Sequence, residues 1–188
     1  MTSHYIDLKL LPDPETGPAQ LLGALYDRLH LALVQQRLDT VGVSFPGYSP
    51  NPRTLGYTLR LHGTSETLSQ FMRTDWLKGM RDHLRMGEIA PVPTDAQHRS
   101  VQRKQFKTNA ERLRRRRMRR KGETAEQAKA AIPDSMEGRP NLPYIHLHSR
   151  STQQAFCLFI ALGPLLTNPT PGHFNSHGLG GPTTIPWF

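Results

Sequence analysis

The chain has 188 residues, which is long enough for one large or two small domains with apolar cores. Its 24 lysines and arginines outnumber 15 acidic residues and give a net charge of +9, so the expected partner is a nucleic acid or an anionic surface. No apolar run approaches the roughly 18 to 20 residues of a membrane span, and the N-terminus lacks a basic-then-apolar signal pattern, so we expect a soluble, cytoplasmic protein without a membrane partner. The single cysteine, Cys157, excludes an internal disulfide and a cysteine zinc cluster.

The beginning of the chain alternates strand and helix patterns. Residues 4–10 alternate apolar and polar side chains, which predicts a half-buried strand. Residues 19–35 carry apolar side chains at helical spacing, in the best amphipathic helix pattern of the sequence. A second strand is expected over residues 40–45, where Pro46 ends it.

Further elements follow before residue 94. Residues 55–61 alternate in the clearest strand pattern, residues 65–72 are expected to form a helix, and residues 84–92 a strand. The resulting order is strand, helix, strand, strand, helix, strand, as in the ferredoxin-like (RRM-like) arrangement of many RNA-binding domains. We therefore predict an α+β fold whose first domain, residues 1–94, is ferredoxin-like.

A concentrated run of arginine, residues 112–121 (RLRRRRMRRK), dominates the second half of the chain. Its two uncharged side chains, Leu113 and Met118, are five residues apart and form no apolar stripe, so core packing alone cannot hold a helix here. Such runs are often solvated tails or nuclear localisation signals. Against this alternative, the planar fork of arginine pairs with phosphate and with guanine, which favours nucleic-acid binding.

Flanking residues predict that this run is helical. Thr108 and Glu111 have the S/T-x-x-E spacing in which two side chains satisfy end donors of a helix, and Gly122 is a typical stop. We therefore expect an arginine-rich helix over about residues 109–121. A shorter helix with its own capping spacing is expected over residues 124–131.

The remaining sequence predicts a β-hairpin and a glycine-rich end. Strands are expected over residues 144–148 and 156–162, joined by a polar turn, which gives a hairpin of about residues 143–162. The last stretch is rich in Pro and Gly. We therefore assign a second domain, residues 95–188, that combines the arginine-rich helix, the β-hairpin and the Gly-rich C-terminal segment.

The nine histidines raise the question of a metal site. His146 and His148 are two apart on an expected strand and share a face, and His173 and His177 follow in a loop. No nearby acid or cysteine completes a zinc site, so a metal is only an alternative to structural or RNA-facing roles. Gly178 begins a glycine run that lacks the Lys-Ser/Thr ending of a phosphate-binding loop, and we expect no cofactor.

Several segments taken together resemble one family. They are DRLHLAL (27–33), GVSFP (42–46), NAERLRRRRMRR (109–120), SRST (149–152) and the terminal PWF. In this order, over essentially the whole chain, they are similar to the CRISPR repeat-processing endoribonuclease of subtype I-F, also called the Ypest subtype.

The resemblance implies an enzyme that cuts CRISPR precursor RNA at the 3′ base of the repeat hairpin. A 2′-hydroxyl attacks the scissile phosphate without a metal or other cofactor, which leaves a 2′,3′-cyclic phosphate and a 5′-hydroxyl. The enzyme then stays on the mature crRNA as a subunit of the type I-F interference complex. The implied partners are therefore the CRISPR repeat stem-loop RNA and the other subunits of that complex.

The resemblance also implies roles for residues at matching positions. His30, which lies off the apolar stripe of its helix, matches the histidine that removes the 2′-hydroxyl proton, and Ser149 matches the serine that positions the same ribose. Arg103 and Gln105 match the pair that recognises base edges. Phe156 matches the aromatic side chain that stacks on the terminal base pair. Further RNA contacts are expected from Arg112, Arg115, Arg116, Arg119, Arg120, Lys121, Ser151 and Thr152.

Two positions depart from the family pattern. His177 stands where a tyrosine is expected beside the active site, so this third catalytic candidate can orient the nucleophile, protonate the leaving oxygen, or do neither. Lys121 replaces a histidine and retains a cation. The main alternative is a non-catalytic protein that binds or caps an RNA hairpin, because it also explains the charge. A hydrolytic metalloenzyme is a more distant alternative.

Overall fold

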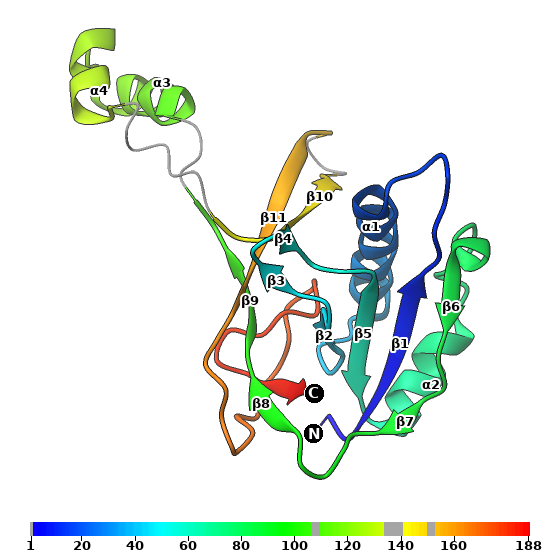
Figure 1. Ribbon diagram of the computed structural model, residues 1–188. Helices are drawn as coiled ribbons and strands as arrows, with labels where there is room; N and C mark the ends of the chain where they lie inside the picture. Colours follow the sequence, from blue (N-terminus) through cyan, green and yellow to red (C-terminus); the bar gives the residue numbers. More distant parts are fainter. Residues whose placement is uncertain (1, 107–109, 134–140, 150–152) are drawn as a thin grey trace. The chain divides into compact units, whose positions relative to one another are not determined.

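The computed structural model (Figure 1) describes residues 2–106, 110–133, 141–149 and 153–188. As predicted, these residues form a mixed α+β structure, with four α-helices and several antiparallel sheets. The chain divides into two compact units, which are residues 1–103 with 142–188, and residues 104–141. The first unit contains the main sheet, and the second contains the arginine-rich helix.

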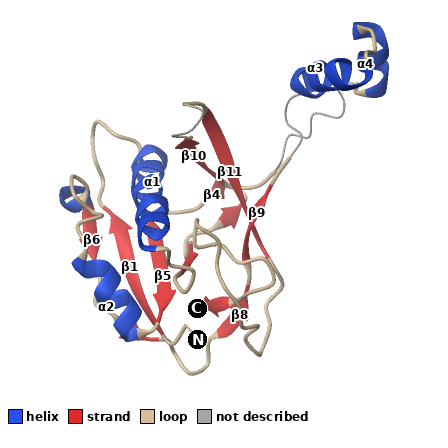
Figure 2. Ribbon diagram, turned by 180° about the vertical axis from the view of Figure 1, so that it is seen from behind, coloured by secondary structure: helices blue, strands red, loops and turns tan. Residues whose placement is uncertain are grey.

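The first unit is built on an antiparallel sheet with strand order β2-β5-β1-β6, in which β7 also pairs with β1. Its strands are β1 (His4–Leu10), β2 (Gly42–Ser44), β5 (Thr58–Gly63), β6 (Leu84–Met86) and β7 (Ala90–Pro91). Two helices follow β1 and β5 in the chain and pack against this sheet (Figure 2). They are α1 (Pro18–Gln36) and α2 (Ser65–Arg73).

The alternating sequence of the strands explains this packing. Along β1, Ile6 and Leu8 are buried and lie opposite Leu61 and Leu59 of β5. Helix α1 has Pro18 in its first turn, where the missing N–H has no intrahelical partner to lose, and it buries its apolar stripe in the same core. The shared core therefore fixes the position of α1.

Some predicted strands are shorter or divided in the structure. The strand expected over residues 84–92 is two strands, β6 and β7, because the exposed Gly87 interrupts the apolar pattern. Strand β5 begins only at Thr58, because Gly56 has a positive φ of 76° and turns the chain. The strand expected over residues 40–45 is reduced to β2.

Some strands lie where the sequence pattern predicts none. β8 (Gln97–Arg99) and β9 (Val101–Lys104) fall in a polar stretch, and β12 (Ile185–Trp187) falls in the Gly-rich segment. β8 pairs with β12, almost at the other end of the chain. Such distant partners supply the hydrogen bonds that local propensity does not predict.

The predicted hairpin is confirmed as β10 (Tyr144–His148) and β11 (Ala155–Leu162), and β9 adds to it in the order β10-β11-β9. The smaller elements of the first unit are β3 (Ser49–Pro50), β4 (Arg53–Thr54) and the 3₁₀ helix η1 (Arg81–His83). Because β8, β10, β11 and β12 all belong to the first unit, the predicted division at residues 94/95 does not coincide with a limit of either compact unit.

The second unit is a pair of helices, α3 (Ala110–Lys121) and α4 (Ala125–Ala131), as predicted. Gly122 ends α3 with a φ of 66°, and its N–H donates to a carbonyl one turn earlier at 2.8 Å. The predicted helix start at Thr108 lies outside the described residues. Neither these helices nor α1 and α2, the other described ones, is long and apolar enough to cross a membrane.

Candidate active site

The imidazole of His30 is held by a loop from near the end of the chain. Helix α1 presents His30 beside this loop, and the ring Nδ1 lies 2.7 Å from the carbonyl oxygen of Ser176. Because a carbonyl oxygen only accepts hydrogen bonds, Nδ1–H is the donor. In the neutral ring the lone pair is then on Nε2, which can accept a proton from a reacting group.

His177 packs directly against His30. The two rings are nearly parallel, at 14°, and their centroids are 3.9 Å apart. Tyr26, which is fully buried one helical turn before His30, donates its hydroxyl proton to the backbone carbonyl of His177 at 2.6 Å. The buried side of α1 therefore holds the loop that holds His30.

Turn chemistry shapes the loop around His177. The side-chain oxygen of Asn175 accepts from the backbone N–H of His177 at 2.8 Å and of Leu179 at 3.2 Å. Gly178 has a φ of 69°, and a Cβ there would approach a Val43 methyl to 2.8 Å, so the position requires glycine. The N–H of Val43 in β2 donates to the Gly178 carbonyl at 2.9 Å and anchors the loop to the sheet.

The ring of His177 is neutral at pH 7. Burial, followed by the charges of His30 and Arg103, lowers the pKa of His177 from its ordinary value of 6.5 to about 4. A neutral ring does not repel the imidazolium that His30 becomes when it takes a proton. His30 can therefore act as the base while the uncharged ring of His177 packs against it.

Arg103 and Phe156 lie near the same cluster. The positive charge of Arg103 acts on both Tyr26 and His177, and its guanidinium lies 5.7 Å from the centre of the Phe156 ring. Phe156 is half-buried on β11 and packs against the core. Of the residues predicted for the site, the structure thus brings together His30, His177, Arg103 and Phe156.

The other residues predicted near the hairpin are Ser149, Gln105, Ser151 and Thr152. Ser149 follows β10, and its backbone N–H donates to the carbonyl of Gln154 at 2.9 Å, which closes the hairpin. Gln105 is exposed and belongs to the second unit. Ser151 and Thr152 lie outside the described residues. The roles of Ser149, Gln105, Ser151 and Thr152 stay predictions.

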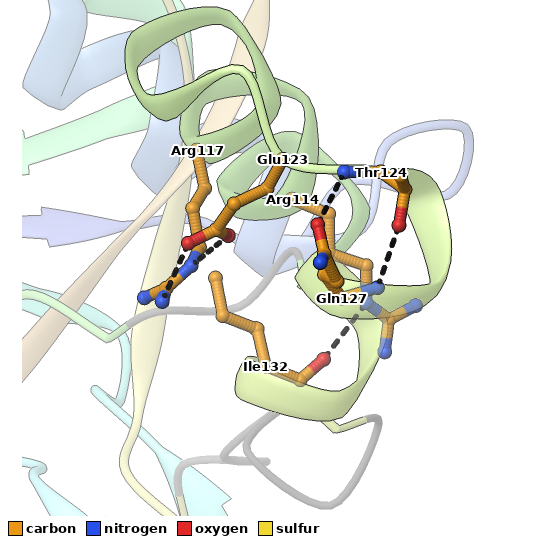
Figure 3. Close-up of polar contacts among 6 residues, drawn as sticks. All are labelled: Arg114, Arg117, Glu123, Thr124, Gln127 and Ile132. Atoms are coloured by element: carbon orange, nitrogen blue, oxygen red, sulfur yellow. Dashed lines mark hydrogen bonds and ion pairs between the residues drawn. The ribbon is translucent and has the colours of Figure 1, made fainter.

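The arginine-rich helix α3 has two kinds of cation. Arg114 and Arg117 hold the second helix of the unit: Arg114 donates to the Ile132 carbonyl at 2.8 Å, and Arg117 forms a two-bond ion pair with Glu123 at 2.5 and 3.0 Å (Figure 3). The other cations of α3 are exposed. They are Arg112, Arg115, Arg116, Arg119, Arg120 and Lys121. This second set is the one predicted to bind RNA.

Helix α4 is itself capped as the sequence predicts. The Thr124 hydroxyl accepts from the Gln127 backbone N–H at 3.2 Å, and the Gln127 side chain accepts from the Thr124 N–H at 3.0 Å (Figure 3). The cap therefore fixes the start of α4, and the Ile132 carbonyl at its other end accepts the hydrogen bond from Arg114.

The sequence prediction missed three groups that build the site, which are Tyr26, Asn175 and the Ser176 carbonyl. Tyr26 precedes His30 by four residues and therefore shares its helix face. The sequence Asn-Ser-His-Gly from Asn175 is typical of a tight turn. Once His30 and His177 are taken as candidate site residues, the four-residue spacing points to Tyr26, and the turn sequence points to Asn175 and Ser176.

The histidines considered for a metal site are used differently. His146 and His148 lie on the exposed face of β10, and His173 pairs with Asp39 at 2.9 Å. His177 stacks on His30. Within the described ranges, no three His, Cys, Asp or Glu side chains are grouped so that they could hold a metal ion.

Comparisons with known proteins agree with the predicted resemblance. Residues 5–188 match the family described as CRISPR-associated protein (Cas_Csy4). The chain is 45% identical over 185 residues to the CRISPR-associated endonuclease Cas6/Csy4 of Pseudomonas aeruginosa (strain UCBPP-PA14), and 40% identical over 185 residues to the protein of the same name of Escherichia coli (strain UTI89 / UPEC). Each match covers 98% of this chain and 99% of the relative. The resemblance is therefore confirmed, and the chain belongs to the Cas_Csy4 family of CRISPR-associated proteins.

Proposed function

We propose that this protein is an endoribonuclease that cleaves CRISPR precursor RNA at the 3′ base of the repeat hairpin and stays bound to the mature crRNA. Both relatives are named CRISPR-associated endonucleases and match this chain over nearly its whole length. The single observation that carries the chemistry is the His30 imidazole, whose Nδ1–H is engaged by Ser176 so that Nε2 is the basic nitrogen.

In the proposed reaction, His30 acts as the general base. Its Nε2 takes the proton of the 2′-hydroxyl, the 2′-oxygen forms a bond to phosphorus, and the bond from phosphorus to the 5′-oxygen breaks. The 5′-oxygen takes a proton from solvent, so the products are a 2′,3′-cyclic phosphate and a 5′-hydroxyl. Because the nucleophile belongs to the RNA, this step does not require a metal.

His177 serves this reaction as a positioning residue. Its depressed pKa, about 4, makes it a poor proton donor to the leaving oxygen near pH 7. Its ring instead covers one face of His30 and restricts the rotation of the base. Ser149, at the end of β10, would hold the attacking ribose in line with phosphorus.

The RNA stem would be gripped by the second unit and recognised near its foot. Phe156 would stack on the terminal base pair, and Arg103 and Gln105 would contact base edges. The proposed contacts to phosphates and groove are Arg112, Arg115, Arg116, Arg119, Arg120, Lys121, Ser151 and Thr152. A-form RNA normally hides its major groove, but a short hairpin has an accessible stem end. Affinity should therefore depend on the hairpin form of the repeat.

The proposed architecture is a ferredoxin-like domain, residues 1–94, that carries the base, and an RNA-recognition region, residues 95–188. The sheet order β2-β5-β1-β6, with helices after β1 and β5, supports the ferredoxin-like assignment. The other subunits of the type I-F interference complex are the proposed protein partners, and the cytoplasm is the proposed location.

The test incubates the purified protein with its cognate repeat hairpin in EDTA and analyses the RNA ends. Cleavage that yields a cyclic phosphate supports the proposal. Tight binding without cleavage would instead favour the non-catalytic capping protein, and cleavage only after addition of a divalent metal would overturn the proposed mechanism.

A further inference from the structure

A groove lies at the first turn of α1. Two neighbouring cavities, of about 550 Å³ and 250 Å³, share Pro18 and Tyr57 in their walls. Pro18 begins α1 and His30 lies twelve residues later, so the groove and the imidazole are about 18 Å apart along the helix axis at 1.5 Å per residue. The groove is thus on the same unit as the candidate active site but distinct from it.

Two cations at this groove face each other. Lys9 of β1 and Arg85 of β6 are exposed and lie directly opposite in the antiparallel ladder, where like charges repel. In the part of the chain that the structure describes, neither forms an ion pair. Asp13, the carboxylate among the described lining residues, is already paired with His83 at 3.1 Å. An anion bound between the two cations would relieve their repulsion.

The walls of the groove also present exposed rings. Tyr57 is 58% exposed and Tyr144 is 39% exposed, and the ring of His146 meets that of Tyr144 edge-on at 4.9 Å. Arg53 lines the smaller cavity together with them. Exposed rings beside cations are the combination by which proteins bind single-stranded nucleic acid, because bases stack on the rings and cations meet the phosphates.

We propose that this groove binds the single-stranded RNA that continues from the foot of the repeat hairpin. The inference rests on the proposed function, since recognition of the hairpin brings that RNA to the enzyme. A base stacks on Tyr57, and the flanking phosphates lie against Lys9 and Arg85. The rings favour RNA over an acidic protein segment, which would satisfy the charges alone.

The experiment measures binding by fluorescence anisotropy with four RNAs. They are the bare hairpin, the hairpin with a 5′ single-stranded extension, the hairpin with a 3′ extension and a 2′-deoxy group at the attacking position, and a single strand without a hairpin. Extensions of about ten nucleotides are within the usual site size for single-strand binding. At least one extension should raise the affinity of the wild-type protein about fivefold to tenfold.

The variants assign that gain to the groove. Tyr57→Ala should remove most of it, whereas Tyr57→Phe, which keeps the ring, should retain it. The double variant Lys9→Gln/Arg85→Gln should lower the salt dependence for the extended RNA by about 1.4, at about 0.7 for each phosphate that the cations neutralise. Arg73→Gln, an exposed cation of α2, is the control and should behave like the wild type. All variants should bind the bare hairpin, and should cleave a hairpin that carries one ribonucleotide beyond the stem, as the wild type does.

Each outcome decides the proposal. A gain from only the 5′ or only the 3′ extension identifies which flank occupies the groove and supports it. No gain from either, or equal weakening of bare and extended hairpin binding in Tyr57→Ala, overturns it. If a peptide of alternating glutamate and leucine binds in a Tyr57-dependent manner and no RNA extension adds affinity, the groove is a protein-docking surface instead. If the bare hairpin is not bound and the hairpin with one further ribonucleotide is not cleaved, the proposed function fails, and Tyr57-dependent binding of the single strand then decides the groove by itself.

Discussion

The two compact units hold their functional side chains by opposite means. In the first unit, His30 and His177 are fixed by a helix and a loop that rest on a large apolar core, to which Tyr26 belongs. In the second unit, Ala110 and Ala128 are the buried apolar residues among those described, and polar contacts join the helices. Packing thus positions the proposed base before RNA arrives, whereas the cationic helix depends on charge. Substitutions in the two units should therefore separate the rate of cleavage from the affinity for RNA.

The largest effect is expected from removal of the base. His30→Ala should lower the single-turnover rate of cleavage by about 10²- to 10⁴-fold, the usual contribution of a general base, while hairpin affinity stays nearly unchanged. His173→Ala, which removes an imidazole that is 77% exposed, is the matched control and should cleave normally. A His30→Ala protein that cleaves at the wild-type rate would contradict the assignment of the base.

The arginines of α3 that are predicted to bind RNA should show the opposite pattern. Arg116→Ala/Arg119→Ala should weaken hairpin binding about 10- to 100-fold and lower the salt dependence of binding by about one for each phosphate that is no longer neutralised. At saturating protein the cleavage rate should stay close to that of the wild type. A rate that falls with unchanged affinity would mean that α3 acts in the chemistry, and the contrast between the two units would fail.

His177 should make stability depend on pH. Its pKa is depressed to about 4 in the folded protein, against 6.5 ordinarily, so the unfolded chain binds the proton more strongly. The free energy of unfolding should therefore fall as the pH is lowered from about 6.5 to about 4. Above that range His177 should add nothing to the pH dependence of this free energy. His177→Tyr should lose less stability over this interval in urea unfolding, and the exposed His173→Tyr should match the wild type. Parallel curves for all three proteins would contradict the buried, neutral state of His177.

The smallest effect is expected from the ion pair that joins α3 to the start of α4. Glu123→Gln removes the charge that meets Arg117 and should speed hydrogen exchange in α3 a few-fold, with only a small decrease in hairpin affinity. High salt should produce a smaller change of the same sign in the wild-type protein, because salt screens a half-buried pair less than an exposed one. Glu88→Gln in the first unit is the control. Unchanged exchange in α3 would show that this pair does not hold the helices together.

The sequence predicts well those features whose cause is local. The strand at residues 4–10, the apolar stripe of α1, the glycine that ends α3 and the capping box of α4 all follow from neighbouring residues, and the structure confirms each of them. The short strands β8 and β12 do not, since they pair with each other from segments far apart in the chain and β8 also bonds to Leu166.

The candidate site also combines features that follow from local sequence with features that depend on distant segments. Position in a family pattern singles out His30 and His177, and the structure stacks them. The stack itself depends on Tyr26 and the Ser176 carbonyl, which come from segments far apart in sequence, and their local signals do not say that the two segments meet. Contacts of that kind are set by tertiary packing, which local pattern does not contain.

The most direct test of the central claim is a crystal structure of the protein with its cleaved hairpin, whose RNA ends in a 2′,3′-cyclic phosphate. We expect Nε2 of His30 within about 2.6 to 3.2 Å of the 2′-oxygen, with Nδ1 still bound to the Ser176 carbonyl. A 2′-oxygen beyond the reach of His30, or a His30 ring turned so that Nδ1 faces the RNA, would contradict it.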